Sequence, residues 1–484
     1  MNRANAALIA WIACVGALCF MGMWGARRTH NGPDFFLASR RLNTGWMSLS
    51  YLANASPAWL LFLIAGSAFT WGLAAVWIWA AMVLGYALNL FWVAPRLRQL
   101  SIGQGSLTLV QLLSNEAGDR LQPLIVRSAA VILSFAMLLE IGAILAETTD
   151  ILAASFGFDM TWSALTAMTV LVAFVLAGGL WSMAFADSVQ VIVLLVIAIC
   201  VPLLAIAVYR DTEGISAALT ALDPAYRDWF AGRSGVVAFA FVAGVSAFGF
   251  GLLGQPHALQ RFMAARDEHA LMLGRWIALA IGASLSGLML LCGWCAALIY
   301  GGLQHPQRAL FAMVERSLPP ALSAWIVTLL LGALLLGIGS RLLVLCAALS
   351  TDMKRSLSPL TYAWARIVLV FYAIAALCLS LWSGMRLTDQ IFLGFTLLGS
   401  AFGPLVLVRL SGKRVRPGST LGAMWAAVVL TLLFHALPDS PGDFLERVLP
   451  FVAALGIALS GGERRRNPDR ADRAQETVHD RVPI

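Results

Sequence analysis

Long apolar runs, repeated along almost the whole chain, are the feature that most constrains its fold. They lie at 5–24, 45–69, 72–95, 123–146, 160–180, 186–208, 235–256, 274–300, 322–349, 361–383, 388–409, 420–437 and 444–461. A helix of about 20 apolar residues crosses the hydrocarbon core of a bilayer. Only 12% of the residues are charged and 60% are hydrophobic, whereas about 25% of a soluble domain is charged. We therefore expect an all-α integral membrane protein with about 13 transmembrane helices.

The positions of the basic residues predict which way these helices face. If the N-terminus lies outside, most of the 33 Lys and Arg residues fall on the cytoplasmic side of the membrane, as the positive-inside rule requires. The segment 463–484 is polar and rich in Arg, which predicts a disordered cytoplasmic tail. We expect a multi-pass protein of the inner or plasma membrane, with the N-terminus outside and the C-terminus in the cytoplasm.

The sequence carries no signal for enzymatic chemistry. Its seven Cys residues all fall inside apolar runs, where neither disulfide pairing nor a metal cluster is indicated. Neither a nucleotide-binding loop nor a nucleophile–base pair is present. We expect no enzyme, no cofactor and no nucleic-acid partner, and the expected partners are the bilayer and a small-molecule solute.

Two of the runs contain residues that interrupt a helix. The run 45–69 holds a polar stretch that ends in Pro57, and the run 235–256 holds a stretch rich in Gly that ends in Pro256. By the predicted topology the two runs cross the bilayer in opposite directions, which is typical of transporters built from inverted repeats. The expected divisions are a first helix and basic loop (1–44), a first repeat (45–210), a second repeat (211–410), two peripheral helices (411–462) and the tail (463–484).

Several motifs follow one another in a characteristic order. They are Asp34-Phe-Phe-Leu-Ala-Ser-Arg-Arg-Leu42, the stretch from Gly178 to Gln190, Gly254-Gln-Pro-His-Ala-Leu-Gln-Arg261-Phe-Met263 and Leu342-Leu-Val344. Together they resemble the sodium:solute symporter family, and within it the branch that transports proline. The resemblance implies an APC/LeuT-like core of two inverted five-helix repeats, which works as a secondary active transporter by alternating access.

The resemblance also implies a sodium site between the break in run 45–69 and two hydroxyl side chains in run 322–349. Here these hydroxyl positions fall on Leu336 and Gly337, which carry no side-chain oxygen, although sodium needs oxygen ligands. Ala53 and Ser56 still offer backbone carbonyls and one hydroxyl. We therefore expect a degraded, weak sodium site. Arg341 follows one turn later, and either its charge replaces the cation and ties this run to run 45–69, or its side chain snorkels to water.

For the solute, the resemblance implies a pocket lined by Trp59, Glu140, Phe248 and Leu252. Glu140 is the only acid well inside a run, and an acid there favours an ammonium or guanidinium group on the solute or carries a proton. An internal ion pair with Arg341 is the third alternative.

Other polar residues fit gating or structural roles. Pro57 marks the first break, and Asp187 and Gln190 are expected at a short cytoplasmic turn. At the inner end of run 235–256 we expect hydrogen bonds that anchor loops or gate the pathway, from Gln255, His257 and Arg261.

The expected function is import of an amino-acid-like or cationic solute with doubtful sodium coupling. Proton-coupled or ion-independent transport is the alternative within the transporter class, with H⁺ as the coupling ion in the first case. A solute-sensing membrane module, which would need a separate signalling partner, is the alternative from another class.

Overall fold

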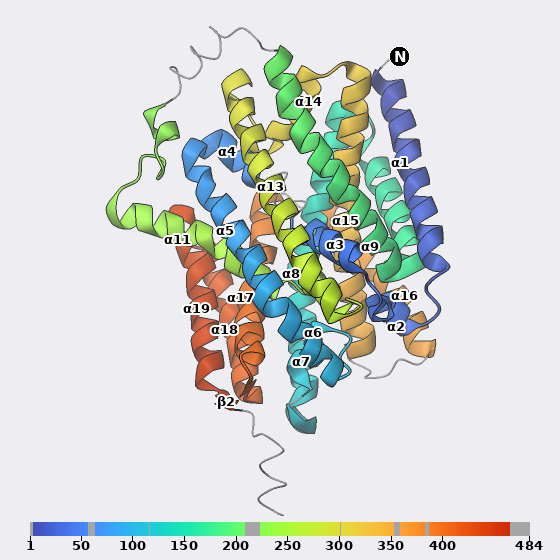
Figure 1. Cartoon of the computed structure of the whole chain (residues 1–484), viewed down its shortest axis with the longest axis vertical. Coiled ribbons are helices and arrows are strands. Elements are labelled where there is room, and N and C mark those ends of the chain that lie inside the picture. Colours follow the sequence, from blue (N-terminus) through green and yellow to red (C-terminus); the bar gives the residue numbers. More distant parts are fainter. Residues whose placement is uncertain are drawn as a thin grey trace, which may run out of the picture.

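The computed structural model describes residues 3–56, 63–115, 117–208, 223–300, 302–352, 359–382 and 387–464. These residues form a bundle of helices, and two short strands, β1 (Lys413–Val415) and β2 (Gly462–Arg464), pair antiparallel at one end (Figure 1). The α-helices are α1 (Arg3–Ala26), α2 (Gly32–Leu37), α3 (Thr44–Ala55), α4 (Ala65–Trp71), α5 (Val76–Ala87), α6 (Ala94–Gly103), α7 (Leu109–Ser114), α8 (Gly118–Phe156), α9 (Met160–Val208), α11 (Gly235–Gly251), α12 (Pro256–Met263), α13 (Glu268–Tyr300), α14 (Ala309–Ser317), α15 (Pro320–Ala347), α16 (Pro359–Trp382), α17 (Leu387–Leu410), α18 (Pro417–His435) and α19 (Phe444–Ser460).

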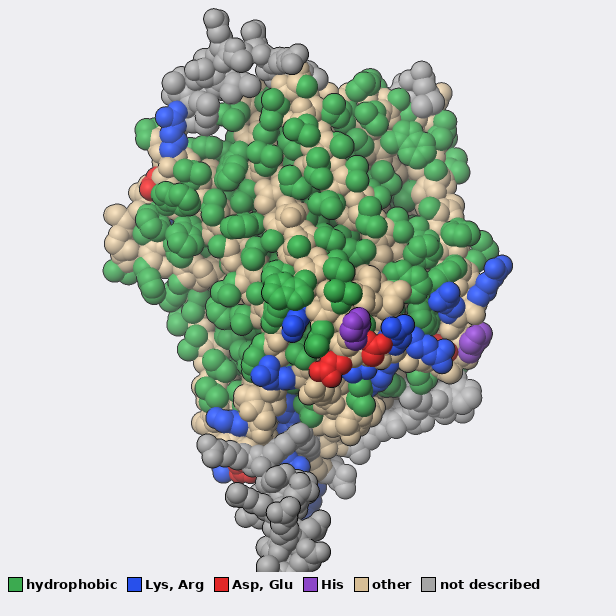
Figure 2. Space-filling view, viewed as in Figure 1, with side chains coloured by type: hydrophobic (Ala, Val, Ile, Leu, Met, Phe, Trp, Pro, Cys, Tyr) green, Lys and Arg blue, Asp and Glu red, His purple; other side chains and the backbone are tan. Residues whose placement is uncertain are grey.

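The prediction of an all-α membrane protein is confirmed. Within the described ranges, 10 helices are long and apolar enough to cross a membrane. The other predicted runs are also helical: 45–69 is divided between α3 and α4, 160–180 and 186–208 both lie in α9, and 444–461 forms α19, which has only 17 residues. Figure 2 shows hydrophobic side chains over a broad band of one face, with many of the charged ones gathered toward the end that holds the two strands.

Both predicted interruptions are visible where the structure describes them. Helix α3 ends at Ala55, and Pro57 lies outside the described residues. The second break is complete, because α11 ends at Gly251, a 3-10 turn covers Leu252–Gly254, and Gln255 is extended before α12 begins. A third break divides α9 at Gly179, whose φ of 52° suits glycine and whose added Cβ would lie 2.4 Å from the carbonyl oxygen of Phe35.

Three helices make the interior of the bundle. Each of these helices contains an apolar stretch of 18 residues. The buried share of that stretch is 89% in α17 and 72% in α8 and α15, but only 28% in α1 and 33% in α18. Helix α8 packs against both α15 and α17. Polar side chains on these three helices are therefore shielded from lipid and can contact one another.

Candidate functional site

A buried ion pair lies at the centre of this interior. Arg341 of α15 donates from Nε to Oε2 of Glu140 on α8 at 2.5 Å, and its Nη1 donates to the carbonyl oxygen of Gly337 at 3.0 Å. The two side chains are 2% and 0% exposed. The prediction that Arg341 snorkels to water is therefore wrong. A tie between its helix and run 45–69, part of which lies outside the described residues, stays a prediction. The alternative of an internal pair with Glu140 is what the structure shows.

One oxygen of this pair is unused. Oε1 of Glu140 has no hydrogen-bond partner among the described residues. Gly394 of α17 closes the third side, because a Cβ at this position would lie 2.7 Å from Cγ of Glu140 and 2.6 Å from the carbonyl oxygen of Ala136. Glu140 is therefore enclosed by α8, α15 and the bare backbone of α17, and half of its carboxylate remains available as an acceptor.

A second buried ion pair joins four elements. Oδ2 of Asp187 on α9 accepts from Nη2 of Arg261 on α12 at 3.0 Å, from Oγ of Ser50 at 2.6 Å and from Nδ2 of Asn54 at 2.8 Å, the last two on α3. Nη2 of Arg261 also donates to Oγ of Ser340 on α15 at 2.7 Å. The prediction of a cytoplasmic turn at Asp187 is wrong, because the helix continues past the kink at Gly179 and carries Asp187 into the interior.

The residues around the second break bond to the chain on either side of it. Nε2 of Gln255 donates to the carbonyl oxygens of Gly251 at 3.2 Å and Phe395 at 3.1 Å. Nε2 of His257 lies 3.2 Å from the carbonyl oxygen of Asn54 at the end of α3. These contacts connect the two broken segments, and a gating or anchoring role for them stays a prediction.

Comparison with known proteins identifies the family. The model of the sodium:solute symporter family matches residues 35–429. The chain belongs to the sodium:solute symporter family. It is similar to the high-affinity proline transporter PutP of Bacillus subtilis, with 28% identity over 91% of this chain and 94% of the relative. It is also similar to the osmoregulated proline transporter OpuE of the same organism, with 26% identity over 92% of each chain. A multi-pass membrane transporter follows, not an enzyme.

Solved structures agree on the fold. A Na⁺-coupled sialic acid symporter in a substrate-bound, outward-open state superposes with a TM-score of 0.77 at 16% identity, over 96% of this chain and 99% of the other. MhsT, solved in complex with L-phenylalanine, gives 0.54 at 14% identity, over 86% and 98%. The expectation of a LeuT-like core is confirmed.

At the sodium position implied by this family, one carbonyl oxygen and one hydroxyl already have hydrogen-bond partners. The carbonyl oxygen of Gly337 accepts from Arg341, and Oγ of Ser56 lies 2.5 Å from the hydroxyl of Tyr86. Ala53 and Leu336 are buried and contribute no side-chain oxygen. These four residues therefore offer no side-chain oxygen apart from the Ser56 hydroxyl, and a degraded sodium site stays a prediction.

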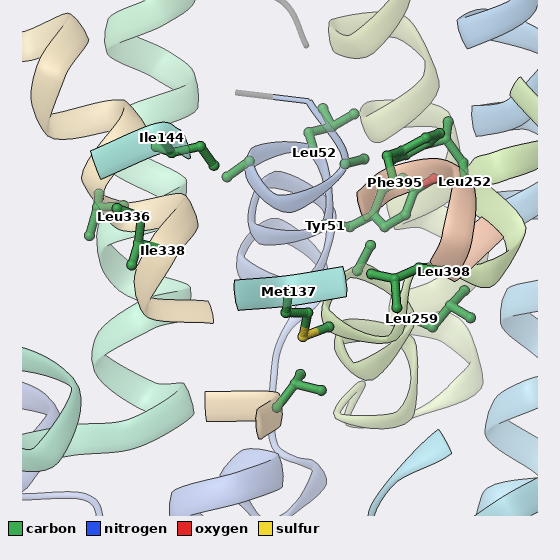
Figure 3. Packing of buried hydrophobic residues seen from close by; sticks show 14 of the residues in the cluster. Tyr51, Leu52, Met137, Ile144, Leu252, Leu259, Leu336, Ile338, Phe395 and Leu398 are labelled. Atoms are coloured by element: carbon green, nitrogen blue, oxygen red, sulfur yellow. The ribbon is translucent and has the colours of Figure 1, made fainter. Parts of the chain in front are cut away.

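Of the predicted solute-binding residues, Phe248 lies in an aromatic cluster. Phe248 of α11 lies 5.6 Å from Phe392 and 6.1 Å from Phe395 between ring centroids. The carbonyl oxygen of Leu252 accepts from Nδ2 of Asn89 at 3.1 Å, while Trp59 lies outside the described residues. Figure 3 shows Leu252, Phe395 and Tyr51 close together, with Ile144 and Leu336 on the opposite side of the view. In this state the aromatic side of the predicted pocket is closed by packing.

Arg447 is a residue of this region that sequence reasoning missed. It is 6% exposed, and its guanidinium carbon lies 4.0 Å from the ring centroid of Phe248 and 5.3 Å from that of Phe392. It also pairs with Asp443 at the start of α19. It lies near the start of run 444–461, where the predicted topology places it on the outer side and an arginine ordinarily reaches water.

Proposed function

We propose that this chain is a secondary transporter of the plasma membrane that imports a small zwitterionic, amino-acid-like solute by alternating access. The observation that carries the proposal is the Arg341–Glu140 pair between α8 and α15. A buried ion pair is weak evidence for stability, because desolvation offsets much of its attraction. Charged side chains inside a membrane protein instead commonly mark substrate and ion pathways.

The charges of the pair suit a zwitterion better than a simple cation. An amino acid carries one ammonium and one carboxylate group, which match Glu140 and Arg341 respectively. A solute with only a positive charge would be repelled by Arg341, 2.5 Å from the acid. The free Oε1 of Glu140 gives the solute ammonium a first acceptor before the internal pair separates. The two relatives in Bacillus subtilis are named as transporters of proline, which is a zwitterion.

For the coupling ion, we propose that Arg341 supplies a permanent positive charge close to the position where the family resemblance implies sodium. Glu140 and Asp187 are each paired with an arginine, so neither presents an uncompensated negative charge to a cation. Leu336 and Gly337 offer no hydroxyl. Sodium coupling is the second candidate, and the family and the Na⁺-coupled symporter of similar fold favour it.

Uptake into proteoliposomes tests both the proposed solute class and the proposed independence from sodium. Purified protein is reconstituted, and uptake of labelled proline, other amino acids and polyamines is measured with an inward gradient of NaCl or of choline chloride. We expect uptake of a zwitterionic amino acid at equal rates in both salts. Arg341→Gln should lower the affinity by about 10- to 100-fold, the effect of losing one charge-assisted hydrogen bond.

Arg266→Gln is the matched control, because Arg266 forms an exposed pair with Asp267. Sodium stimulation of about tenfold or more would overturn the sodium-independent reading and support the second candidate. Uptake of polyamines but no amino acid would overturn the solute class.

A further inference from the structure

A cavity of about 250 Å³ lies between α1, α9 and α15, away from the Arg341–Glu140 pair. Small residues hollow it out, among them Ala13 and Ala17 of α1 and Gly332 and Ala333 of α15. Ala13 and Ala17 are exposed, so the cavity is open at the side of α1. Exposed apolar side chains such as Ile12 and Phe20 continue along the same helix, and in a membrane this surface faces lipid. Molecules dissolved in the bilayer therefore have access to the cavity.

One polar side chain in the lining has no partner. Gln190 of α9 is 7% exposed, and neither Nε2 nor Oε1 has a hydrogen-bond partner among the described residues. A buried amide without a partner costs free energy, because water would otherwise bond to it. Nearby, Thr328 donates its hydroxyl proton to the carbonyl oxygen of Ala324 and keeps its lone pairs free to accept. The cavity thus offers a donor and an acceptor within an otherwise apolar wall.

The lining selects against charge. All the described residues that line the cavity are uncharged, and most are Ala, Val, Leu, Gly or Met. A water molecule's share of liquid volume is about 30 Å³, so the cavity holds a chain of roughly eight groups of that size. A void of this size is unfavourable when empty, since its walls lose dispersion contacts.

We propose that the cavity binds a neutral amphipathic molecule from the bilayer, a single apolar chain whose hydroxyl or carbonyl group hydrogen-bonds to the Gln190 amide. The apolar chain fills the space between the small residues, and the polar group partners the buried amide. Leu336, where the family resemblance places a sodium-site hydroxyl, is part of the same wall. The occupant therefore contacts the helix that carries Arg341 and would restrain its movement, whatever solute is transported.

Photolabelling of the full-length protein tests the site. A ten-carbon alcohol with a diazirine in its chain is irradiated with the detergent-purified protein, and labelled peptides are mapped by mass spectrometry. We expect labels on α1 and α15 at the cavity. Unlabelled 1-decanol should compete, decane should compete about tenfold less well for want of one hydrogen bond, and decyltrimethylammonium should not compete. Labels confined to other surfaces, or equal competition by the charged compound, would overturn the proposal.

Two variants separate the cavity from general detergent binding. Ala13→Leu combined with Ala17→Leu fills the space and should abolish the labels, whereas Gly16→Leu should not, because nothing lies within 4 Å of a Cβ at that position. Gln190→Leu should remove the advantage of decanol over decane while labelling persists. Labels that survive the filling variant would contradict the site. If that variant does not fold, the competition series on the unsubstituted protein decides the question.

Discussion

The two buried arginine–carboxylate pairs differ in how completely their acids are bonded. One oxygen of Asp187 accepts three hydrogen bonds, from Arg261, Ser50 and Asn54. Glu140 accepts from Arg341 through one oxygen and leaves the other without a described partner. The larger number of bonds holds Asp187 more firmly in one arrangement, whereas Glu140 has more unused capacity for another partner. We infer that the first pair holds the broken segments in place and that the second exchanges partners with the solute.

Removing Asp187, the acid that accepts more hydrogen bonds, should have the largest effect on stability. Asp187→Ala leaves the guanidinium of Arg261 buried without its counter-charge, which should lower the free energy of unfolding by about 3–5 kcal/mol. Thermal unfolding of the purified protein, followed by tryptophan fluorescence, measures this loss. Glu463→Ala is the control, because Glu463 forms an exposed pair with Arg416, and it should leave the melting temperature nearly unchanged. A loss for Asp187→Ala below about 1 kcal/mol would contradict a structural role for this pair.

The Glu140 pair should respond differently, with function more sensitive than stability. Glu140→Gln should lower the stability by about 2–3 kcal/mol, since the amide oxygen can still accept from Arg341. Adding Arg341→Gln removes the uncompensated charge and should restore stability to within about 1 kcal/mol of the unsubstituted protein. Solute uptake should stay lost in the double variant. Recovery of uptake together with stability would show that the pair is only structural.

The sequence predicts the helices well because hydropathy acts locally. The sequence also predicts the breaks in runs 45–69 and 235–256, because Gly and Pro disfavour helix in any context. Glu140 and Arg341 stood out for the same reason, as charges inside apolar runs. The sequence leaves a contact of Arg341 with run 45–69, a side chain that reaches water and a pair with Glu140 as alternatives. The packing of α15 on α8 makes Glu140 its neighbour.

Tertiary contacts also explain why Asp187 and Arg447 are buried where the sequence predicts exposure. Asp187 follows a Gly-containing stretch that resembles a turn, but the chain kinks at Gly179 and resumes as helix, which buries the acid among residues from three other elements. Arg447 lies near the start of its run, where an arginine ordinarily reaches water. It is buried because α19 packs against α11 and brings it over Phe248. Neither outcome has a local signature.

Gly394 on α17 offers a test of whether the solute binds next to Glu140. Gly394→Ala places a methyl group 2.7 Å from Cγ of Glu140, and overpacking of this kind costs about 1–3 kcal/mol. The side chain of Glu140 must shift, so solute affinity should fall along with the melting temperature. Gly418→Ala on α18 is the matched control, because a Cβ there meets nothing within 4 Å. Binding measured by isothermal titration should be unchanged in the control, and an unchanged affinity in Gly394→Ala would place the solute away from Glu140.

Removing the partly exposed ion pair of Arg308 should cause the smallest loss of stability. This loss is the reference against which the losses at the buried pairs are compared. Burial disfavours the charge of Arg308, but its bonds to Glu147 and Asp150 outweigh this and raise the pKa of Arg308 above its ordinary value. A raised pKa means that the contribution of the Arg308 charge is lost only as the pH rises through that pKa, so none should be lost between neutral pH and about pH 10. Because Arg308 is 24% exposed, Arg308→Gln should cost about 0.5–1 kcal/mol and less at high salt. Melting temperatures in 100 mM and 1 M NaCl (roughly 10 Å and 3 Å of screening length) check this. A salt-independent loss as large as that of Asp187→Ala would mean that a solvent-accessible pair stabilises the fold as much as a buried one. The number of hydrogen bonds to Asp187 and to Glu140 would then no longer explain the different roles of the two buried pairs.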